Sequence, residues 1–312
     1  MKKVLSISIG SSKRDHKVHT TILDEEFIIE RRGTDGDKEM ARQMFVELDG
    51  KYDAFGIGGI DLYIYAGNKR YTFLDAKKMI NNVKKTPAVD GSGLKNTLER
   101  IVITYLDRKL DLDFGNKKVL MVSGTDRFGM AETFVELKAD VVFGDLIFAL
   151  GVPIRIKSLK MLAVVAGLFA PVITKLPIEW IYPTGNRQDD NIISNKFGRY
   201  YREADIIAGD FHLIKKYMPP VLRDKIIITN TVTVDNIKDL KERGVSMIVT
   251  TTPELNGRSF GTNVIEGVLV ALAGKRPDQL NEEDYRKLLN KINFTPRVID
   301  FENKGVYQEG IS

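Results

Sequence analysis

Residues 117–145 read KKVLMVSGTDRFGMAETFVELKADVVFGD, and the order of patterns in this stretch decides the fold. An apolar run at 119–123 is followed by a turn at 124–129 and by a helical pattern at 130–137. A second β-branched run follows at 141–143. Short apolar runs that alternate with helices are typical of buried parallel strands. The stretch therefore predicts a strand, a tight turn, a helix and a second parallel strand.

The turn in this unit lies where nucleotide-binding sheets hold phosphate. Backbone N–H groups and a helix N-terminus at the carboxyl end of a first parallel strand can bind a pyrophosphate. Asp145 lies 21 positions after Gly124. In dinucleotide-binding units an acidic residue roughly 20 positions after the glycine turn accepts hydrogen bonds from the ribose hydroxyls. Gly124 and Gly129 depart from the full glycine pattern, because four larger residues separate them. The unit predicts either a dinucleotide site or a Rossmann-type unit that kept the topology and lost the dinucleotide.

The predicted cofactor is NAD or NADP, with NAD preferred. A carboxylate at Asp145 would repel the 2′-phosphate of NADP. The positive charges of Arg155 and Lys157 would attract that phosphate, so NADP stays an alternative. The predicted contacts in this unit are Gly124, Thr125, Asp126, Arg127, Phe128, Gly129 and Asp145. Ligands on open α/β sheets bind outside the carboxyl ends of the strands. Polar residues after three later strands therefore add Asp210, Asn230, Thr231 and Thr251 to the predicted cofactor contacts.

The whole chain reads as an α/β protein in two parts. We predict an N-terminal α/β substrate domain at 1–114 and a Rossmann-type doubly wound parallel-sheet domain at 115–277, divided at the charged segment 107–116. A C-terminal helix within 278–312 could pack back on the first domain. Strands are expected at 4–9, 27–30, 54–57, 206–208, 226–229 and 247–251, helices at 39–48, 76–83, 235–243, 263–273 and 282–292, and a hairpin at 60–73 turning at 66–68.

Composition excludes several classes of function. The 47 basic residues are interleaved with 42 acidic ones, which argues against a nucleic-acid partner. There is no cysteine, and the three histidines are dispersed, so we expect no metal site. The most apolar stretch, 161–173, is shorter than the ~20 residues of a membrane span and reads as a buried helix, so no membrane partner is expected. The start MKKVLSISIG reads as a strand rather than a signal peptide, which predicts a cytoplasmic protein. We expect it to be a monomer or a homodimer.

A second motif, TPAVDGSGLK at 86–95, carries a resemblance. It is similar to the asparagine-threonine-aspartate-glycine-x-glycine motif of the quinate and shikimate 5-dehydrogenase family, of which this chain would be a divergent member. The entry GNKKVL at 115–120 and the segment ITNTVT at 228–233 extend the likeness. The resemblance implies hydride transfer between a nicotinamide cofactor and a hydroxylated cyclic carboxylate. The resemblance implies that Asp90 is the catalytic aspartate of the family. It also implies a catalytic lysine, for which Lys13 and Lys95 are the candidates.

The same resemblance implies a small-molecule carboxylate substrate bound near the first strand. Ser8, Ser11 and Ser12 would bind the substrate carboxylate, with Arg14 supplying positive charge. The altered glycine turn and the displaced lysine leave two alternatives open. One is a dehydrogenase of another small acid or of a pterin-type substrate. The other is a non-catalytic ligand or nucleotide sensor on the same fold.

Overall fold

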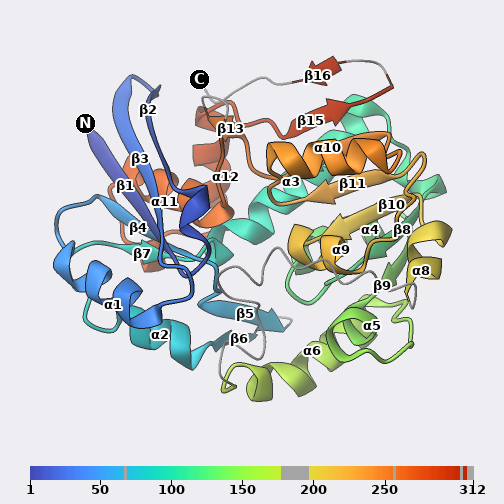
Figure 1. Cartoon of the computed structure of the whole chain (residues 1–312), viewed down its shortest axis with the longest axis horizontal. Coiled ribbons are helices and arrows are strands. Elements are labelled where there is room, and N and C mark those ends of the chain that lie inside the picture. The colour runs from blue at the N-terminus through green and yellow to red at the C-terminus, as the bar shows by residue number, and fades with distance from the viewer. Residues whose placement is uncertain (67–68, 177–196, 256–257, 303–304, 308–312) are drawn as a thin grey trace.

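The computed structural model describes residues 1–66, 69–176, 197–255, 258–302 and 305–307, and its strands form two larger sheets (Figure 1). The first sheet has the order β2-β3-β1-β4-β7. Strand β1 pairs in parallel with β3 and β4, β4 pairs in parallel with β7, and β2 is antiparallel to β3. The bounds are β1 (Lys2–Ser8), β2 (His16–Ile22), β3 (Glu25–Gly33), β4 (Ala54–Gly58) and β7 (Ala88–Val89).

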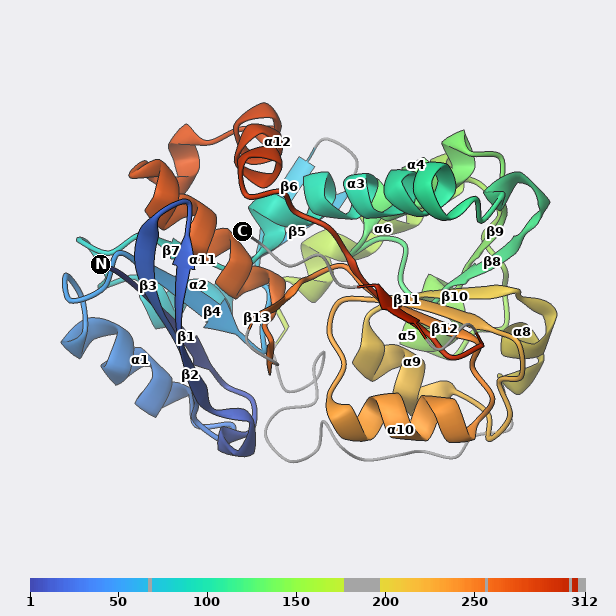
Figure 2. The same ribbon diagram turned by 90° about the horizontal axis from the view of Figure 1, so that it is seen from above.

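Alternation along β1 gives this sheet two apolar faces. Leu5 and Ile7 join a core with α1 (Lys38–Glu47) and α2 (Leu74–Ile80). Val4, on the opposite face, joins a core with α3 (Ser92–Leu110), α11 (Thr262–Ala273) and α12 (Glu282–Lys291). Figure 2 shows α11 crossing behind the first sheet and α12 beside it. The hairpin β5 (Tyr63–Ala66) and β6 (Lys69–Thr72) forms a separate two-stranded sheet.

The second sheet has the order β16-β15-β12-β11-β10-β8-β9. Five of its strands are parallel, and β15 and β16 add an antiparallel edge. Because β9 lies on one side of β8 and β10 on the other, the topological switch point falls between β8 and β10. The bounds are β8 (Lys118–Met121), β9 (Asp140–Phe143), β10 (Ile206–Gly209), β11 (Ile226–Thr229), β12 (Met247–Thr250), β15 (Arg297–Asp300) and β16 (Gly305–Tyr307).

Helices cover both faces of the second sheet. Phe134 and Leu162 bring α4 (Phe128–Glu136) and α6 (Leu159–Ile173) into one core, together with the C-terminal half of α3. The opposite core holds α5 (Asp145–Leu150), α8 (Gly198–Glu203), α9 (Phe211–Tyr217) and α10 (Val234–Glu242). The remaining short elements are β13 (Glu254–Leu255), β14 (Arg258–Ser259) and the 3-10 turns Ser12–Arg14, Phe114–Asn116 and Pro277–Gln279. No helix in the described ranges has the length and apolarity required to cross a membrane.

Several features differ from the sequence prediction. Helix α11 packs on β1 and β4 of the first sheet, although the predicted division placed it in the range 115–277 with the second. Helix α3 continues to Leu110, so the charged segment 107–116 is helical over its first four residues and is not a free linker. Strands β2 and β15 were not predicted. Of the turn predicted at 66–68, residues 67–68 lie outside the described residues.

Helix α6 corrects the expectation of a fully buried helix at 161–173. Its buried side chains, Leu162, Ala166 and Ala170, recur every four residues and define one face only. The opposite face is exposed, with Leu168 at 68% of its full accessibility. The prediction of α12 is confirmed, and Asn281 begins it with a capping box that includes Asp284.

The position of α11 makes the first sheet dependent on the far end of the chain. A fragment of residues 1–114 leaves the Val4 face of the sheet exposed, so we expect no cooperative thermal unfolding transition by circular dichroism. Joining residues 260–296 to that fragment through a glycine-serine linker restores α11 and α12. This joined fragment is expected to unfold cooperatively. A cooperative transition of fragment 1–114 alone would contradict the packing.

Candidate functional site

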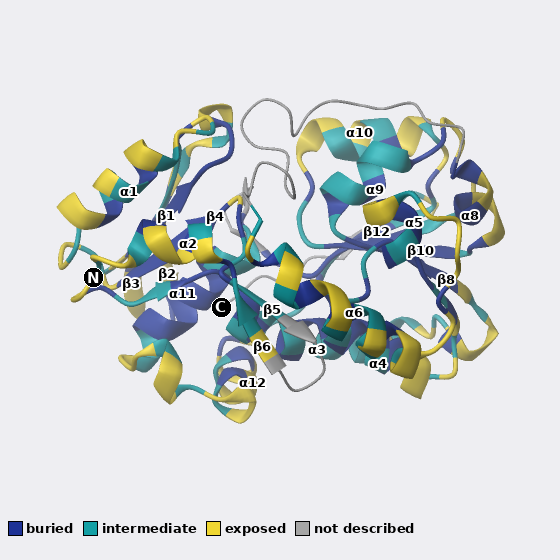
Figure 3. Ribbon diagram, turned by 90° about the horizontal axis from the view of Figure 1, so that it is seen from below, coloured by how far each residue is buried: buried dark blue, intermediate teal, exposed yellow. Residues whose placement is uncertain are grey.

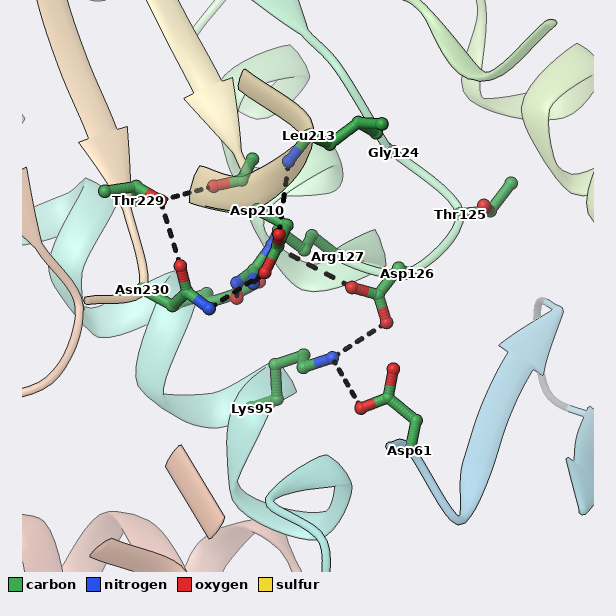
Figure 4. A network of polar contacts seen from close by, with 12 residues as sticks. Asp61, Lys95, Gly124, Thr125, Asp126, Arg127, Asp210, Leu213, Thr229 and Asn230 are labelled. Carbon is green, nitrogen blue, oxygen red and sulfur yellow. Dashed lines mark hydrogen bonds and ion pairs between the residues drawn. The ribbon is translucent and has the colours of Figure 1, made fainter. Parts of the chain in front are cut away.

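One buried ammonium joins the two halves of the structure. Lys95 Nζ, on the first turns of α3, lies 2.7 Å from Asp126 Oδ1 and 3.7 Å from Asp61 Oδ1. Asp126 belongs to the turn after β8, and Asp61 follows β4 of the first sheet. Figure 4 shows the Lys95 side chain pointing between the two carboxylates. The side chains retain only 13%, 23% and 19% of their accessibility, in the order Lys95, Asp126, Asp61. Carboxylates from both halves therefore meet at one cation.

The electrostatics hold Lys95 in its charged form. Burial disfavours the ammonium, but attraction to Asp126 and Asp61 outweighs it, and the pKa of Lys95 lies above its ordinary value. The pKa of Asp126 is lowered, because Lys95 and Arg127 overcome the effect of its burial. An ammonium held in this way can donate a hydrogen bond or a proton to a substrate oxygen.

Arg127 lies behind this group, in a second buried ion network. Its guanidinium pairs with Glu99 of α3, and both side chains are almost fully buried. Arg127 Nη2 is 3.6 Å from Asp210 Oδ2, and Asp210 also accepts a hydrogen bond of 2.9 Å from Asn230 Nδ2. The pKa of Glu99 is raised by burial, against the attraction of Arg127 and Lys95. The guanidinium is thus paired with carboxylates of the protein itself, and removing one partner would leave a buried charge uncompensated.

Asp210 and Asn230 are thus brought together, as expected for neighbouring strand ends. Asp210 caps α9 by accepting hydrogen bonds from the N–H groups of His212 (2.9 Å) and Leu213 (3.4 Å). Thr229 Oγ1 donates to Asn230 Oδ1 at 3.0 Å. Much of the hydrogen-bonding capacity of these strand ends is therefore used within the protein.

Asp145, predicted to bind ribose, instead hydrogen-bonds to the turn at Gly124 that was predicted to bind pyrophosphate. Asp145 accepts hydrogen bonds from the Gly124 N–H (3.0 Å), the Thr125 N–H (2.9 Å) and Thr125 Oγ1 (2.7 Å). Burial raises the pKa of Asp145, and these hydrogen bonds oppose that shift. Buried N–H groups require an acceptor, and the acid at the end of the neighbouring strand provides it. A nucleotide could use these groups only after Asp145 and the turn separate.

The start of α4 is also filled by protein. A Cβ on Gly129 would clash with Asn96 Oδ1 and would lie 2.7 Å from the Asn96 carbonyl oxygen, so the glycine permits the close crossing of α3 and α4. Phe128 begins α4, and its side chain packs against the core beneath the second sheet. Gly129 and Phe128 therefore have packing roles that their assignment as cofactor contacts did not anticipate.

Asp90 holds the chain in place through four hydrogen bonds. Its Oδ2 accepts from the N–H groups of Leu62 (2.6 Å) and Tyr63 (3.0 Å), and its Oδ1 accepts from Ser92 N (3.1 Å) and Ser92 Oγ (2.6 Å). These bonds tie the loop after β4 to the start of α3. Asp90 therefore positions the segments that carry Asp61 and Lys95, and the catalytic role that the resemblance implies for it stays a prediction.

Of the two predicted lysines, Lys95 belongs to the ion cluster and Lys13 lies exposed in the turn Ser12–Arg14. The other predicted substrate residues surround Arg31 of β3. Arg31 donates to Ser8 Oγ at 3.0 Å, to the Ser11 carbonyl at 3.0 Å and to Asp15 Oδ1 at 2.7 Å. Burial, and then the neighbouring charge of Arg14, lower the pKa of Arg31 to about 10. Ser12 N donates to Asp35 Oδ1.

Five charged residues of the site and its surroundings were not predicted from the sequence: Asp61, Glu99, Arg31, Asp15 and Glu266, which hydrogen-bonds to the Gly91 N–H. Glu99 follows Lys95 by one helical turn, a spacing that could have placed both on one face of α3. Asp61 and Glu266 gave no comparable signal, because their partners are distant in sequence. Among the described residues, no group of histidine and acidic side chains has the arrangement of a metal site. Within the described residues, the buried hydroxyl groups of Ser123 and Thr251 have no hydrogen-bond partner.

Glu266 of α11 is a buried carboxyl group close to Asp90. Burial, and then the charge of Asp90, raise the pKa of Glu266 to about 8. Its Oε1 accepts a hydrogen bond from Tyr285 Oη at 2.8 Å, and its Oε2 accepts one from Gly91 N at 2.7 Å. The side chain thus connects α11 and α12 to the start of α3 while remaining largely protonated at neutral pH.

The raised pKa of Glu266 predicts a pH-dependent stability. The folded chain holds this proton more tightly than the unfolded chain, so the contribution is complete below the ordinary glutamate pKa and is lost as pH rises towards about 8. In urea unfolding, the free-energy difference between wild type and Glu266→Gln should fall by on the order of a few kcal/mol between about pH 5 and about pH 8. Glu283→Gln, on the exposed side of α12, is the matched control. A pH-independent difference would contradict the assignment.

Comparison with known proteins gives a family but no activity. No curated protein matches the chain. Glutamate dehydrogenase from Thermus thermophilus is 12% identical over 94% of this chain and 74% of that chain, with a TM-score of 0.43. The NAD-dependent malic enzyme from Thermotoga maritima is 10% identical over 93% and 83%, with a TM-score of 0.34. A sugar ABC transport substrate-binding protein from Bordetella parapertussis is 11% identical over 97% and 90%, with a TM-score of 0.36.

These TM-scores are too low to support an argument about function. The family comparison covers the chain in two pieces. Residues 3–90 match the domain of unknown function DUF8753. Residues 93–301, more than half of the chain, match the domain of unknown function DUF8754, and the protein belongs to that family.

Proposed function

We propose that this chain is an NAD(P)-dependent oxidoreductase that acts on the C–O group of a small hydroxylated carboxylate, as the resemblance to quinate and shikimate 5-dehydrogenases implies. The observation that carries the proposal is the Lys95 ammonium held between Asp61 and Asp126. The group lies at the carboxyl ends of the strands of the second sheet, where ligands of open α/β sheets bind. Asp61 adds a carboxylate from the first part of the chain.

The raised pKa of Lys95 keeps the side chain protonated at neutral pH, so the acid form that a reductive step requires is the one present. When bound, a reduced nicotinamide supplies the hydride that adds to a carbonyl carbon. Lys95 donates a proton to the carbonyl oxygen, which becomes the hydroxyl of the product, and the neutral amine regains a proton from water. Asp61 and Asp126 keep the lysine charged and fix its direction. In oxidation, Lys95 must first lose a proton, which the two carboxylates oppose.

The described residues fit a dinucleotide in part. Ser123 and Thr251 offer buried hydroxyls without protein partners, at the ends of β8 and β12. Asn230 and Thr231 lie between them in the order of the strands, and these four residues are the proposed contacts. The Gly124 and Thr125 N–H groups fit a pyrophosphate only if Asp145 releases them. NAD is preferred over NADP because the negative charge of Asp145 would repel the 2′-phosphate of NADP.

The paired turn also favours a second candidate function, a ligand sensor without catalysis. A turn whose N–H groups are satisfied by Asp145 has no requirement for phosphate. In that case a small anionic ligand binds at the loop after β1, where the charge of Arg14 lies near that of Arg31. No chemical step then follows.

Cofactor binding separates the two candidates. In isothermal titration calorimetry, the oxidoreductase proposal expects saturable binding of NADH or NADPH at concentrations up to about 1 mM. The Asp145→Asn variant tests the preference for NAD, since removing the charge should narrow the difference between the two cofactors. Absence of binding by both cofactors, with quinate or shikimate still bound, would leave the sensor.

Lys95 is expected to carry the chemical step. Lys95→Met should lower turnover of quinate or shikimate by about 10²–10⁴-fold, because a positioned acid or base contributes that much, while cofactor affinity stays near that of wild type. Lys13→Met, which removes an exposed lysine, is the matched control and should retain wild-type turnover. Asp90→Asn should lower the melting temperature, because Asp90 holds the loop at Leu62 in place. The turnover of the folded fraction should change little. Equal turnover of Lys95→Met and wild type would contradict the role of Lys95.

A further inference from the structure

The exposed side of α6 is the largest feature that the proposed function does not use. Eight of the sixteen exposed large apolar side chains of the described residues lie between positions 150 and 172. Five of them are on α6 itself: Met161, Val164, Leu168, Phe169 and Val172. Figure 3 shows exposed turns along this helix on the lower side of the molecule. Soluble surfaces carry single exposed apolar residues without a reason, but a continuous group on one helix indicates a binding surface.

These residues form a stripe along the helix. Met161, Val164, Leu168 and Val172 follow one another at three or four residues, which places them on one face. The opposite face, with Leu162, Ala166 and Ala170, is buried against the protein. No charged side chain interrupts the helix from Met161 to Ile173. Three further exposed apolar residues, Leu150, Val152 and Ile154, precede it.

The charges around this face have one sign. From residue 146 to residue 176 the chain contains Arg155, Lys157, Lys160 and Lys175 and no acidic residue. Arg155 pairs with Glu203 at 2.6 Å. The three lysines are exposed, and within the described chain they form no ion pair. They stand at both ends of the apolar stripe, two before it and one after it.

We propose that the exposed face of α6 binds the surface of a membrane that contains anionic lipids. An apolar stripe flanked by lysines and free of acids is the pattern of a helix that lies in the interface, with its apolar side among the acyl chains and its cations at the headgroups. At 15 residues, α6 lies on such a surface and does not cross it. The expectation of no membrane partner concerned a helix that crosses the membrane, which α6 is too short to do.

A second copy of the chain fits this face less well. In an antiparallel pairing of two α6 helices, Lys157 and Lys160 of one copy approach Lys175 of the other. The cations then repel one another across an interface that contains no carboxylate from this stretch. An anionic surface satisfies the same lysines, so the charge pattern favours lipid.

Cosedimentation of the full chain with vesicles tests the proposal. The chain should bind vesicles of phosphatidylcholine with phosphatidylglycerol at least about tenfold more tightly than vesicles of phosphatidylcholine alone, and high salt should remove that difference. Val164→Glu/Leu168→Glu should lower binding by about tenfold or more. The matched control is Met40→Glu/Val46→Glu, which places the same charges on exposed positions of α1 and should bind as wild type does.

Two further measurements keep the outcome clear. Lys157→Gln/Lys160→Gln/Lys175→Gln, which leaves the apolar stripe intact, should lose the preference for phosphatidylglycerol. Circular dichroism should show that all variants are folded, since every substituted residue is exposed. No vesicle binding by wild type, or equal binding by the α6 double variant, overturns the proposal. So does a wild-type dimer in light scattering that Val164→Glu/Leu168→Glu dissociates without any vesicle binding.

Discussion

The buried pairing of Arg127 with Glu99 is the interaction on which the site depends. Two charges taken out of water are stable only with close partners, so α3 and the turn after β8 are fixed against each other. Lys95, one helical turn before Glu99, is then carried to Asp126, the neighbour of Arg127 in sequence. Asp61 completes the group from the other half of the chain. The position of the Lys95 ammonium therefore follows from a salt bridge beneath it.

Two predicted functional aspartates act as acceptors for backbone groups. Asp145 satisfies the turn at Gly124, and Asp90 satisfies the loop at Leu62. In both places an irregular segment buries N–H groups that no strand or helix pairs, and a short carboxylate provides the missing acceptors. The same residue types at the same spacing thus serve either a ligand or the fold. Only the partners that the structure brings near distinguish the two.

The sequence predicted the second parallel sheet well because its signals are local. Apolar runs, a turn and helical spacing within 117–145 fix β8, α4 and β9 without reference to the rest of the chain. The packing of α11 on the first sheet and the meeting of Asp61 with Lys95 depend on contacts between distant segments, which local patterns do not record. The same holds for α6, whose apolar composition fits a buried helix and a surface-binding helix equally. Among the predicted site residues, Lys95 and Asp126 were brought together, whereas Lys13 was not.

The chain passes between the two sheets three times in its described ranges: along α3, between β12 and α11, and between α12 and β15. A protein whose lobes are joined by one segment can swing and twist freely about it. Three crossings at separate points restrict rotation of one sheet relative to the other, because all three segments must bend together. Relative movement of the two sheets is therefore restricted, because a change in any one crossing must be accommodated by the other two.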